Sequence, residues 1–418
     1  MMRAMKPAAR MDSIGTETAF EVSARARALE ATGQSIVYLQ IGEPDFDTPA
    51  NVREAAKAAL DGGMTHYPPY AGLPDLRAAI AADTTARRGF TAEPSNVFVT
   101  VGGKGVMVYA IMALIDPGDE AIVPDPGYPI YESITRFVGG TAVPIPIRQE
   151  NDFRLDVDEL ASLITPRTKL IVINSPANPT GGVLTRGDIE RIAELAVRHD
   201  LVVLSDEIYS RILYDGAEHV SIASLDGMAE RTITLDGFSK TYAMTGWRMG
   251  YAIVPDWLVK PYGQLIINTI SGVTAFAQAG AIEALRGPQA EVDAMVDEFR
   301  ARRDLIVDGL NDIPGFSCLR PQGAFYVFPD ISGTGMSGAE VAERLLVEAG
   351  VCVLAGTAFG GVGVNHIRIS YANSRENLIE ALGRIRRWVE PLVAAGSAGA
   401  AGDARAAGAS TGATSGVR

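Results

Sequence analysis

The sequence predicts an α/β fold, in which a large domain with a mostly parallel, helix-covered sheet is followed by a smaller α+β domain. Three observations support this fold class. Short β-branched runs are apolar at both alternating positions, as is typical of parallel strands buried on both faces. Helical patterns separate several of these runs. A chain of 418 residues also exceeds what one hydrophobic core usually serves, so two domains are expected.

The strands of the large sheet are predicted from apolar runs separated by Gly and Pro. Helical patterns lie between several of them, as at 105–114 and 186–198. This alternation predicts a sheet with helices packed against it. The predicted strands are 97–101, 121–123, 170–173, 201–204, 232–235 and 251–254.

The pattern changes at a long amphipathic segment, 290–310, which predicts a helix that opens the smaller domain. The elements expected after it are a strand at 324–328, a helix at 338–349, strands at 351–354 and 366–371, and a last helix at 374–389.

Domain boundaries follow from these elements and from composition. Ala, Gly, Ser and Thr dominate the end of the chain, and such a segment cannot bury enough apolar surface to order itself. We expect a flexible N-terminus at 1–13, an N-terminal arm and small-domain segment at 14–45, the large domain at 46–288, the small domain at 289–393 and a disordered tail at 394–418.

The composition excludes several classes of function. The net charge of −13 and the pI near 4.9 argue against binding to nucleic acid or to anionic membranes. No apolar run is long enough for a transmembrane helix, and no signal peptide is visible. The two cysteines, Cys318 and Cys352, form no motif, and the four histidines lack ligand spacing. We therefore expect a cytoplasmic protein without a metal site that acts on small molecules.

Polar residues follow four of the predicted strands. Asp206 and Tyr209 follow 201–204, and Asn178 follows 170–173. Gly103 and Lys104 follow 97–101 and open a helix, where free backbone N–H groups favour an anion. Each of these residues alone has an ordinary explanation as a cap or a turn. Together, at one edge of one sheet, they predict a ligand site.

The fourth strand, 232–235, leads into a segment with a lysine among small and hydroxyl residues. Lys240 in this segment could form a Schiff base with an aldehyde, and Arg248 could pair with a phosphate. A lone lysine is more often an ordinary surface residue. Its place beside the other strand ends favours a catalytic role with pyridoxal 5′-phosphate as the cofactor.

A glycine-rich run at 333–338 matches the dinucleotide-binding pattern G-x-G-x-x-G. No acidic residue ends the next predicted strand, 351–354, as that motif requires. A flexible turn is therefore the better interpretation.

These motifs resemble the class I aminotransferases of the aspartate aminotransferase family, which are pyridoxal-phosphate enzymes of fold type I. The resemblance extends from about residue 14 to residue 389, and the spacings between its motifs also match. It implies that 46–288 is the cofactor-binding domain. The motifs that carry it are 41–46, 67–77, 178–181, 206–209, 240–248 and 368–371.

The resemblance implies roles for residues around the cofactor ring. Lys240 would carry the Schiff base, and Asp206 would pair with the protonated ring nitrogen. Asn178 and Tyr209 would hydrogen-bond the ring hydroxyl oxygen, while Tyr128 would cover the ring face. The catalytic residues would be Lys240, Asp206 and Tyr209.

For the phosphate, the resemblance implies the backbone of Gly103 and Lys104 together with Ser239 and Arg248. Tyr67 would reach the phosphate of a neighbouring subunit, so a homodimer with shared active sites is expected.

The substrate α-carboxylate would bind Arg368, Asn178 and the backbone of Gly42. A guanidinium can grip a carboxylate at two points and so orient the Cα–H bond. One departure is Gly237, which stands where many relatives place a serine against the phosphate.

The implied function is transfer of an amino group between an L-amino acid and a 2-oxo acid, of the aspartate/glutamate type. The alternatives are a β-lyase, decarboxylase or oxidase reaction at the same Schiff base, or a preference for aromatic, aliphatic or basic amino acids. A regulatory protein with a degenerate domain is disfavoured because Lys240 and Asp206 are intact. Side-chain specificity stays open, since Lys104 favours an acidic substrate and Glu17 a basic one.

Overall fold

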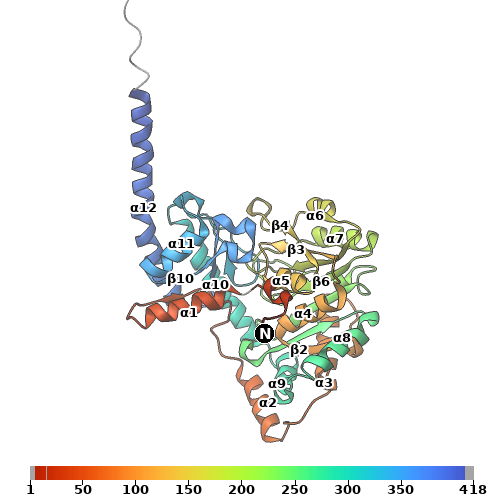
Figure 1. The fold of residues 1–418 in the computed structure, drawn as a ribbon. Coiled ribbons are helices and arrows are strands. Elements are labelled where there is room, and N and C mark those ends of the chain that lie inside the picture. Colours follow the sequence, from red (N-terminus) through yellow and green to blue (C-terminus); the bar gives the residue numbers. More distant parts are fainter. Residues whose placement is uncertain (1–4, 16, 410–418) are drawn as a thin grey trace, which may run out of the picture.

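The computed structural model describes residues 5–15 and 17–409 and contains a seven-stranded sheet covered by helices (Figure 1). The strand order is β2-β8-β7-β6-β5-β3-β4. The strands are β2 (Val97–Val101), β3 (Glu120–Asp125), β4 (Thr141–Pro146), β5 (Thr168–Asn174), β6 (Val202–Asp206), β7 (Thr232–Gly237) and β8 (Met249–Ile253).

Most of the sheet is parallel, which confirms the predicted fold class. β4, β3, β5, β6 and β7 pair in parallel, whereas β8 lies antiparallel between β7 and β2. The sequence does not predict β4. Its two prolines, Pro144 and Pro146, interrupt the strand pattern, and they are tolerated because β4 lies at the edge of the sheet.

Both faces of the inner part of the sheet are buried, and this explains why its strands are mostly apolar at both alternating positions. In β5, Leu170 and Val172 belong to one hydrophobic cluster, whereas Ile171 and Ile173 belong to the other. Successive side chains of a strand point to opposite faces, so each face needs its own set of apolar residues.

The helices of this part of the chain cover both faces of the sheet. The helix α7, for example, begins with a capping box in which Thr185 and Asp188 bond each other's backbone N–H, and its bounds match the predicted ones. The helices are α2 (Ala50–Asp61), α3 (Pro74–Arg88), α4 (Gly102–Leu114), α5 (Ile130–Phe137), α6 (Val157–Leu163), α7 (Arg186–Arg198), α8 (Asp256–Thr269) and α9 (Ala275–Arg286).

The rest of the chain forms two small sheets with their own helices. β1 pairs in parallel with β10, so a segment near the N-terminus joins the C-terminal part. The three-stranded sheet has the order β11-β12-β9. The elements are α1 (Thr18–Glu30), β1 (Val37–Tyr38), α10 (Ala290–Asn311), β9 (Tyr326–Val327), α11 (Gly338–Arg344), a π-helical turn (Leu345–Ala349), β10 (Val351–Cys352), β11 (Leu354–Ala355), β12 (Ile367–Ser370) and α12 (Arg375–Ala409). The domain boundaries themselves stay predictions.

The helix α12 extends away from the rest of the molecule (Figure 1). It continues through 394–409, where the sequence predicts a disordered tail. Alanine is frequent there and is the best helix former, and extending an existing helix needs no new nucleation. The rest of the predicted tail, 410–418, and the first part of the predicted flexible N-terminus, 1–4, lie outside the described residues.

The glycine-rich run at 333–338 forms a turn, as expected. Gly335 has a φ of +74°, and a Cβ on Gly338 would lie 2.0 Å from the carbonyl oxygen of His366. The last glycine thus permits close packing of α11 on the segment that leads into β12.

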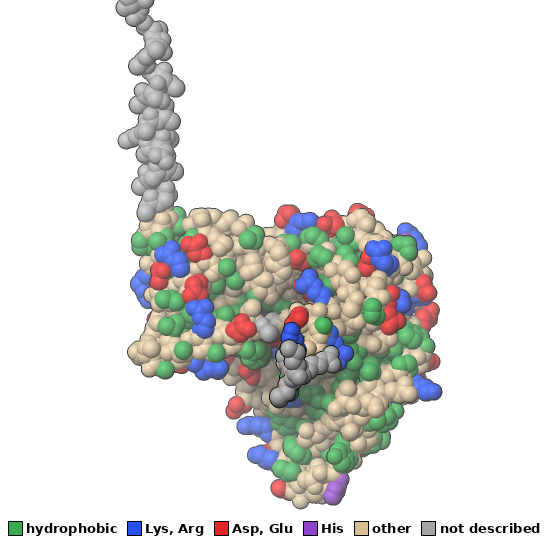
Figure 2. Space-filling view, viewed as in Figure 1, with side chains coloured by type: hydrophobic (Ala, Val, Ile, Leu, Met, Phe, Trp, Pro, Cys, Tyr) green, Lys and Arg blue, Asp and Glu red, His purple; other side chains and the backbone are tan. Residues whose placement is uncertain are grey.

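Within the described residues, no helix is long and apolar enough to cross a membrane. The face shown in Figure 2 carries acidic and basic side chains interspersed, without a continuous basic patch that could follow a phosphate backbone.

Candidate active site

A cavity of about 490 Å³ opens at the carboxyl ends of β5, β6 and β7, beside the N-terminus of α4. Eleven of the predicted site residues line it, and they come from both the large sheet and the three-stranded sheet. These residues are Gly42, Gly103, Lys104, Tyr128, Asn178, Asp206, Tyr209, Ser239, Lys240, Arg248 and Arg368.

Asp206 lies at the end of β6 and is only 2% exposed. Its Oδ2 accepts a hydrogen bond of 2.6 Å from the hydroxyl of Tyr131, and its Oδ1 accepts one of 3.2 Å from the backbone N–H of Ile208. No cationic side chain pairs with it within the described part of the chain. Burial raises the pKa of Asp206 to about 7. A cation beside this carboxylate would restore its charged form, so the position fits a protonated ring nitrogen.

Lys240 follows β7, and its Nζ donates a hydrogen bond to the backbone carbonyl of Gly42. Desolvation of the amine lowers the pKa of Lys240 to about 8, and the positive charges of Arg368 and Arg248 act in the same direction. A larger fraction of the amine is therefore neutral near physiological pH than for an ordinary lysine, and the neutral amine is the nucleophilic form.

The end of the cavity near α4 is suited to an anion. Arg248 has a φ of +55°, its Nη1 donates to the carbonyl of Thr245 at 2.8 Å, and a Cβ on Gly102 would lie 2.4 Å from its Nη2. The glycine therefore lets the guanidinium lie against the first turn of α4. The free N–H groups of that turn and the guanidinium together fit a phosphate, with Ser239 also on the cavity wall.

Gly237, where the resemblance noted from the sequence leads us to expect a serine, has little space for a side chain. A Cβ there would lie 2.9 Å from Cα of Gly250, and a Cβ on Gly250 would lie 2.4 Å from the carbonyl carbon of Gly102. The backbones of β7, β8 and the start of α4 are in direct contact at these glycines. Glycine at 237 supplies no hydroxyl to a phosphate, and a larger residue there would require these backbones to move apart.

Arg368 lies in β12 and is 4% exposed. Its Nη1 donates to Oδ1 of Asn178 at 3.2 Å, and its Nη2 donates to the backbone carbonyl of Gln40. Its Nε is buried and has no hydrogen-bond partner among the residues that the structure describes. A buried donor without an acceptor is costly, so this guanidinium is ready to bind a carboxylate.

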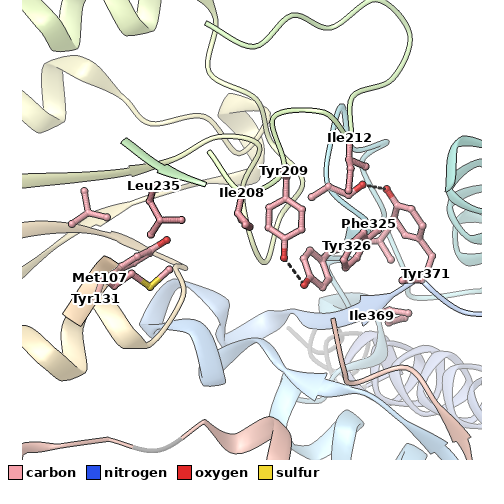
Figure 3. Packing of buried hydrophobic residues seen from close by; sticks show 14 of the residues in the cluster. Met107, Tyr131, Ile208, Tyr209, Ile212, Leu235, Phe325, Tyr326, Ile369 and Tyr371 are labelled. Carbon is pink, nitrogen blue, oxygen red and sulfur yellow. Dashed lines mark hydrogen bonds between the residues drawn. The ribbon is translucent and has the colours of Figure 1, made fainter. Parts of the chain in front are cut away.

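Two tyrosine hydroxyls meet on one side of the cavity, as Figure 3 shows. The hydroxyls of Tyr209 and Tyr326 are 2.8 Å apart and hydrogen-bonded. A Cβ on Gly42 would lie 1.8 Å from the hydroxyl oxygen of Tyr326, so this position requires glycine. Tyr326 thus links Tyr209 to the segment that accepts the hydrogen bond of Lys240.

The sequence does not predict Tyr131 or Tyr326 as site residues. Tyr131 could have been found, because it lies three residues after Tyr128, which is about one helical turn. Tyr326 lies in a strand of the small sheet, and no local pattern indicates that it reaches a site formed by the large sheet.

At one wall of the cavity, Glu17 and Lys104 form an ion pair. The carboxylate of Glu17 also accepts a hydrogen bond of 2.9 Å from the hydroxyl of Tyr128. The two residues that favour opposite substrate charges are therefore partners of each other, and each reduces the charge that the other presents to a ligand.

Tyr67 is not part of this cavity. Its side chain is 92% exposed, and it lies beside another hollow lined by 64–68 and 272–276. Within one chain, the structure does not bring Tyr67 to the other predicted residues.

A network of buried charges lies directly behind the site. Arg88 is 6% exposed and contacts both Glu207 and Asp236, while His219 Nε2 lies 3.0 Å from Oε2 of Glu207. His219 and then Arg88, together with hydrogen bonds from His219 and Ser221, outweigh burial and lower the pKa of Glu207 well below its usual value. Glu207 adjoins Asp206 in the chain, so the network holds the ends of β6 and β7 together.

These features fit pyridoxal phosphate. The cavity combines an unpaired buried carboxylate, an amine with a lowered pKa, and an anion site formed by Arg248 and the start of α4. A cofactor with a ring nitrogen, an aldehyde and a phosphate has complementary groups for all three.

Comparison with known proteins identifies the family. Residues 34–385 match the family model for aminotransferase class I and II. An aspartate aminotransferase of Pyrococcus abyssi is 44% identical over 85% of this chain and 92% of its own length. An arginine–pyruvate transaminase of Pseudomonas aeruginosa is 44% identical over 88% of this chain and 93% of its own.

Solved structures agree with these matches. The aspartate aminotransferase of Thermus thermophilus, solved with maleate, superposes with a TM-score of 0.88 at 41% identity and covers 92% of this chain and 99% of its own. The family as a whole depends on pyridoxal phosphate and acts on amino acids and 2-oxo acids. The chain therefore belongs to the class I and II aminotransferase family and is a transferase of amino groups.

Proposed function

We propose that this aminotransferase binds pyridoxal phosphate on Lys240 and exchanges an amino group between an L-amino acid and a 2-oxo acid, one of which is dicarboxylic. The observation that carries the proposal is the meeting of Lys240, Asp206 and Arg368 in one cavity. The amine of Lys240 can attach the cofactor, and the carboxylate of Asp206 can stabilise the charge on its ring nitrogen. The guanidinium of Arg368 can bind the carboxylate of the substrate.

Several residues would hold the cofactor. Asp206 would bind the ring nitrogen, and Asn178 and Tyr209 the ring hydroxyl oxygen, with Tyr128 over the ring. The phosphate would bind Gly103, Lys104, Ser239 and Arg248. When bound, pyridoxal phosphate supplies an electron sink for the charge that develops at the substrate Cα.

The chain's own residues would then handle binding and proton transfer. Arg368, Asn178 and the backbone of Gly42 would hold the α-carboxylate and so aim Cα–H at Lys240. Lys240 is the general base and acid at this carbon, and its lowered pKa suits that role because proton transfer is most effective near the working pH.

A dicarboxylic partner is supported by the contacts of Lys104. Its side chain is 41% exposed, whereas that of Glu17 is 16% exposed and keeps a hydrogen bond to Tyr128. Lys104 can therefore turn toward a distal carboxylate while Glu17 retains a partner. A basic amino acid is the second candidate, because the carboxylate of Glu17 also lies on the cavity wall, and relatives named for aspartate and for arginine are about equally similar.

A homodimer with shared active sites is supported by the surface around Tyr67. Tyr67, Met64 and Tyr70 expose large apolar side chains close together in sequence. Such exposure often marks a contact with another chain. Mixing Tyr67→Phe with Lys240→Ala chains tests this: some activity should return on subunit exchange, and an active monomer in sedimentation would contradict the shared site.

We also propose a cytoplasmic location. Both cysteines, Cys318 and Cys352, are buried and unpaired, which is compatible with a reducing compartment.

The substrate proposal is tested with a panel of amino donors against 2-oxoglutarate, oxaloacetate and pyruvate. The purified, cofactor-loaded protein should be yellow and should be bleached by its amino donor. Activity with 2-oxoglutarate or oxaloacetate as the preferred acceptor would support the dicarboxylic assignment. Preference for pyruvate with arginine or lysine would instead support the second candidate.

A further inference from the structure

The carboxylate of Asp125, at the end of β3, binds the backbone of the loop that precedes β12. Oδ2 of Asp125 accepts a hydrogen bond of 3.0 Å from the backbone N–H of Gly361, and Oδ1 accepts one of 3.1 Å from Val362. Beside them, the N–H of Gly127 donates to the carbonyl of Phe359 at 2.8 Å. The contact therefore uses both oxygens of Asp125 and joins parts of the chain that belong to different sheets.

The loop has a backbone shape that only glycine permits at the point of contact. Gly360 has a φ of +139°, and a Cβ there would lie 2.0 Å from Oδ1 of Asp125. At the base of the loop, a Cβ on Gly356 would lie 2.2 Å from the carbonyl oxygen of Gly363. The loop 356–363, formed by η8 (Gly356–Phe359) and the start of η9 (Gly361–Asn365), is thus a compact turn closed on itself.

Both sides of this contact lead to the active site. On the loop side, the ring of Phe359 lies 4.8 Å from Cζ of Arg368. On the sheet side, Tyr128 follows Asp125 in the same turn and lines the cavity. Asp125 itself is not a lining residue of the cavity, so it can act there only through its neighbours.

We infer that Asp125 is a positioning residue: by fixing the loop 356–363, it holds Phe359 against the guanidinium of Arg368 and so orients that guanidinium for the substrate α-carboxylate. The inference rests on the proposed function, in which Arg368 binds that carboxylate. A carboxylate that accepts two backbone N–H groups is a strong anchor because both bonds are charge-assisted.

The test compares Asp125→Asn with Asp119→Asn. The first variant keeps the shape of the side chain but turns one acceptor into an NH₂ group that faces a backbone N–H. Asp119 precedes the opposite end of β3, where it accepts a hydrogen bond of 2.9 Å from Asp116 and lies 3.0 Å from Nζ of Lys169. It loses similar contacts on mutation but does not touch the loop, so it is a matched control.

Two measurements are made on the protein loaded with pyridoxal phosphate. Hydrogen exchange of peptides that cover 356–363 should be faster in Asp125→Asn than in the parent and in Asp119→Asn. KM should rise about tenfold for both the amino acid and the 2-oxo acid, because a displaced Arg368 guanidinium would lose about one charge-assisted hydrogen bond to their shared α-carboxylate, with kcat changed by less than about threefold. Gly360→Ala should reproduce both effects, since its Cβ displaces the same carboxylate.

Unchanged exchange in the loop, or a KM equal to that of Asp119→Asn, would overturn the inference. If Asp125→Asn does not fold, Gly360→Ala decides between these outcomes. The proposed function fails in a different way: Arg368→Lys would then leave KM unchanged. In that case Arg368 does not bind the α-carboxylate, so Asp125 cannot position it for that purpose. The hydrogen-exchange measurement still shows whether Asp125 holds the loop.

Discussion

The hydroxyl of Tyr131 donates a hydrogen bond of 2.6 Å to Oδ2 of Asp206, and this bond opposes the effect of burial on the carboxyl group. Burial raises the pKa of Asp206, whereas the bond from Tyr131 lowers it. Tyr131 therefore helps to keep Asp206 in the charged form that a protonated ring nitrogen requires.

Replacing Tyr131 with phenylalanine should weaken cofactor binding. The pKa of Asp206 should rise further above 7, and the dissociation constant for pyridoxal phosphate should increase about tenfold, the effect of one hydrogen bond to a charged group. Titration of the cofactor-free protein measures this. Tyr109→Phe is the control, because the hydroxyl of Tyr109 bonds Thr269 and lies outside the cavity. Equal affinities for the two variants would contradict the role of Tyr131.

Attachment of the cofactor should depend on pH through Lys240. Only the neutral amine attacks the aldehyde, and the pKa of Lys240 is lowered to about 8 in the protein without cofactor. The attachment rate should therefore rise about tenfold per pH unit below pH 8 and level off above it. Stopped-flow absorbance checks this, with Lys240→Ala as the blank. A rate that keeps rising up to pH 10 would show that the pKa of Lys240 is that of an ordinary lysine.

Replacing Glu17 with glutamine should shift substrate preference toward acids. The change removes the partner of Lys104, so kcat/KM for dicarboxylic substrates should rise by about three- to tenfold relative to cationic ones, as expected for a partly exposed charge. Glu30→Gln, on the same helix α1 but bonded to Tyr38, should change nothing. If the preference moves toward basic amino acids instead, Lys104 and Glu17 do not determine the specificity for the substrate side chain as proposed.

The buried network behind the site should be important for stability. Arg88→Met removes the guanidinium that contacts both Glu207 and Asp236 and should lower the free energy of unfolding by about 3–5 kcal/mol at pH 8. The neighbouring Arg87→Met removes only a pair at the helix surface and should cost less than about 1 kcal/mol.

The loss caused by Arg88→Met should also shrink at lower pH. His219 and Arg88 together lower the pKa of Glu207, so in the parent this carboxylate stays charged and stabilising until the pH falls well below its ordinary pKa. In the variant the pKa of both carboxylates should rise, including that of Asp236, whose pKa burial already raises in the parent, and protonation at lower pH should relieve part of the penalty. Urea denaturation at pH 8 and pH 5 measures the difference. Equal losses at both values would mean that packing, and not charge, explains the effect.

Much of the large sheet could be predicted because its strands are buried on both faces, and this produces apolar runs that are easily distinguished from their surroundings. The antiparallel direction of β8 could not be predicted, since a strand buried on both faces has the same pattern in either direction. β4 was missed because its prolines and its edge position weaken the strand pattern.

The candidate site was predictable to the extent that its residues directly follow strands. Asp206 and Lys240 lie at the ends of β6 and β7, so the sheet brings them together. Tyr326 and Asp125 depend on contacts between sheets that are distant in sequence, and no local periodicity encodes such contacts. The roles of all these residues stay predictions until the variants are measured.

The wall that carries Glu17 has a consequence for the evolution of this enzyme. Glu17, Ala19 and Phe20 come from one short stretch at the start of α1, whereas Gly42 beside Lys240 and Gly102 beside Arg248 have no space for a Cβ. Part of the cavity wall is therefore encoded in a segment separate from the residues around Lys240. A few substitutions in the N-terminal stretch can change the range of substrates at little cost in folding, and directed evolution of this protein should begin there.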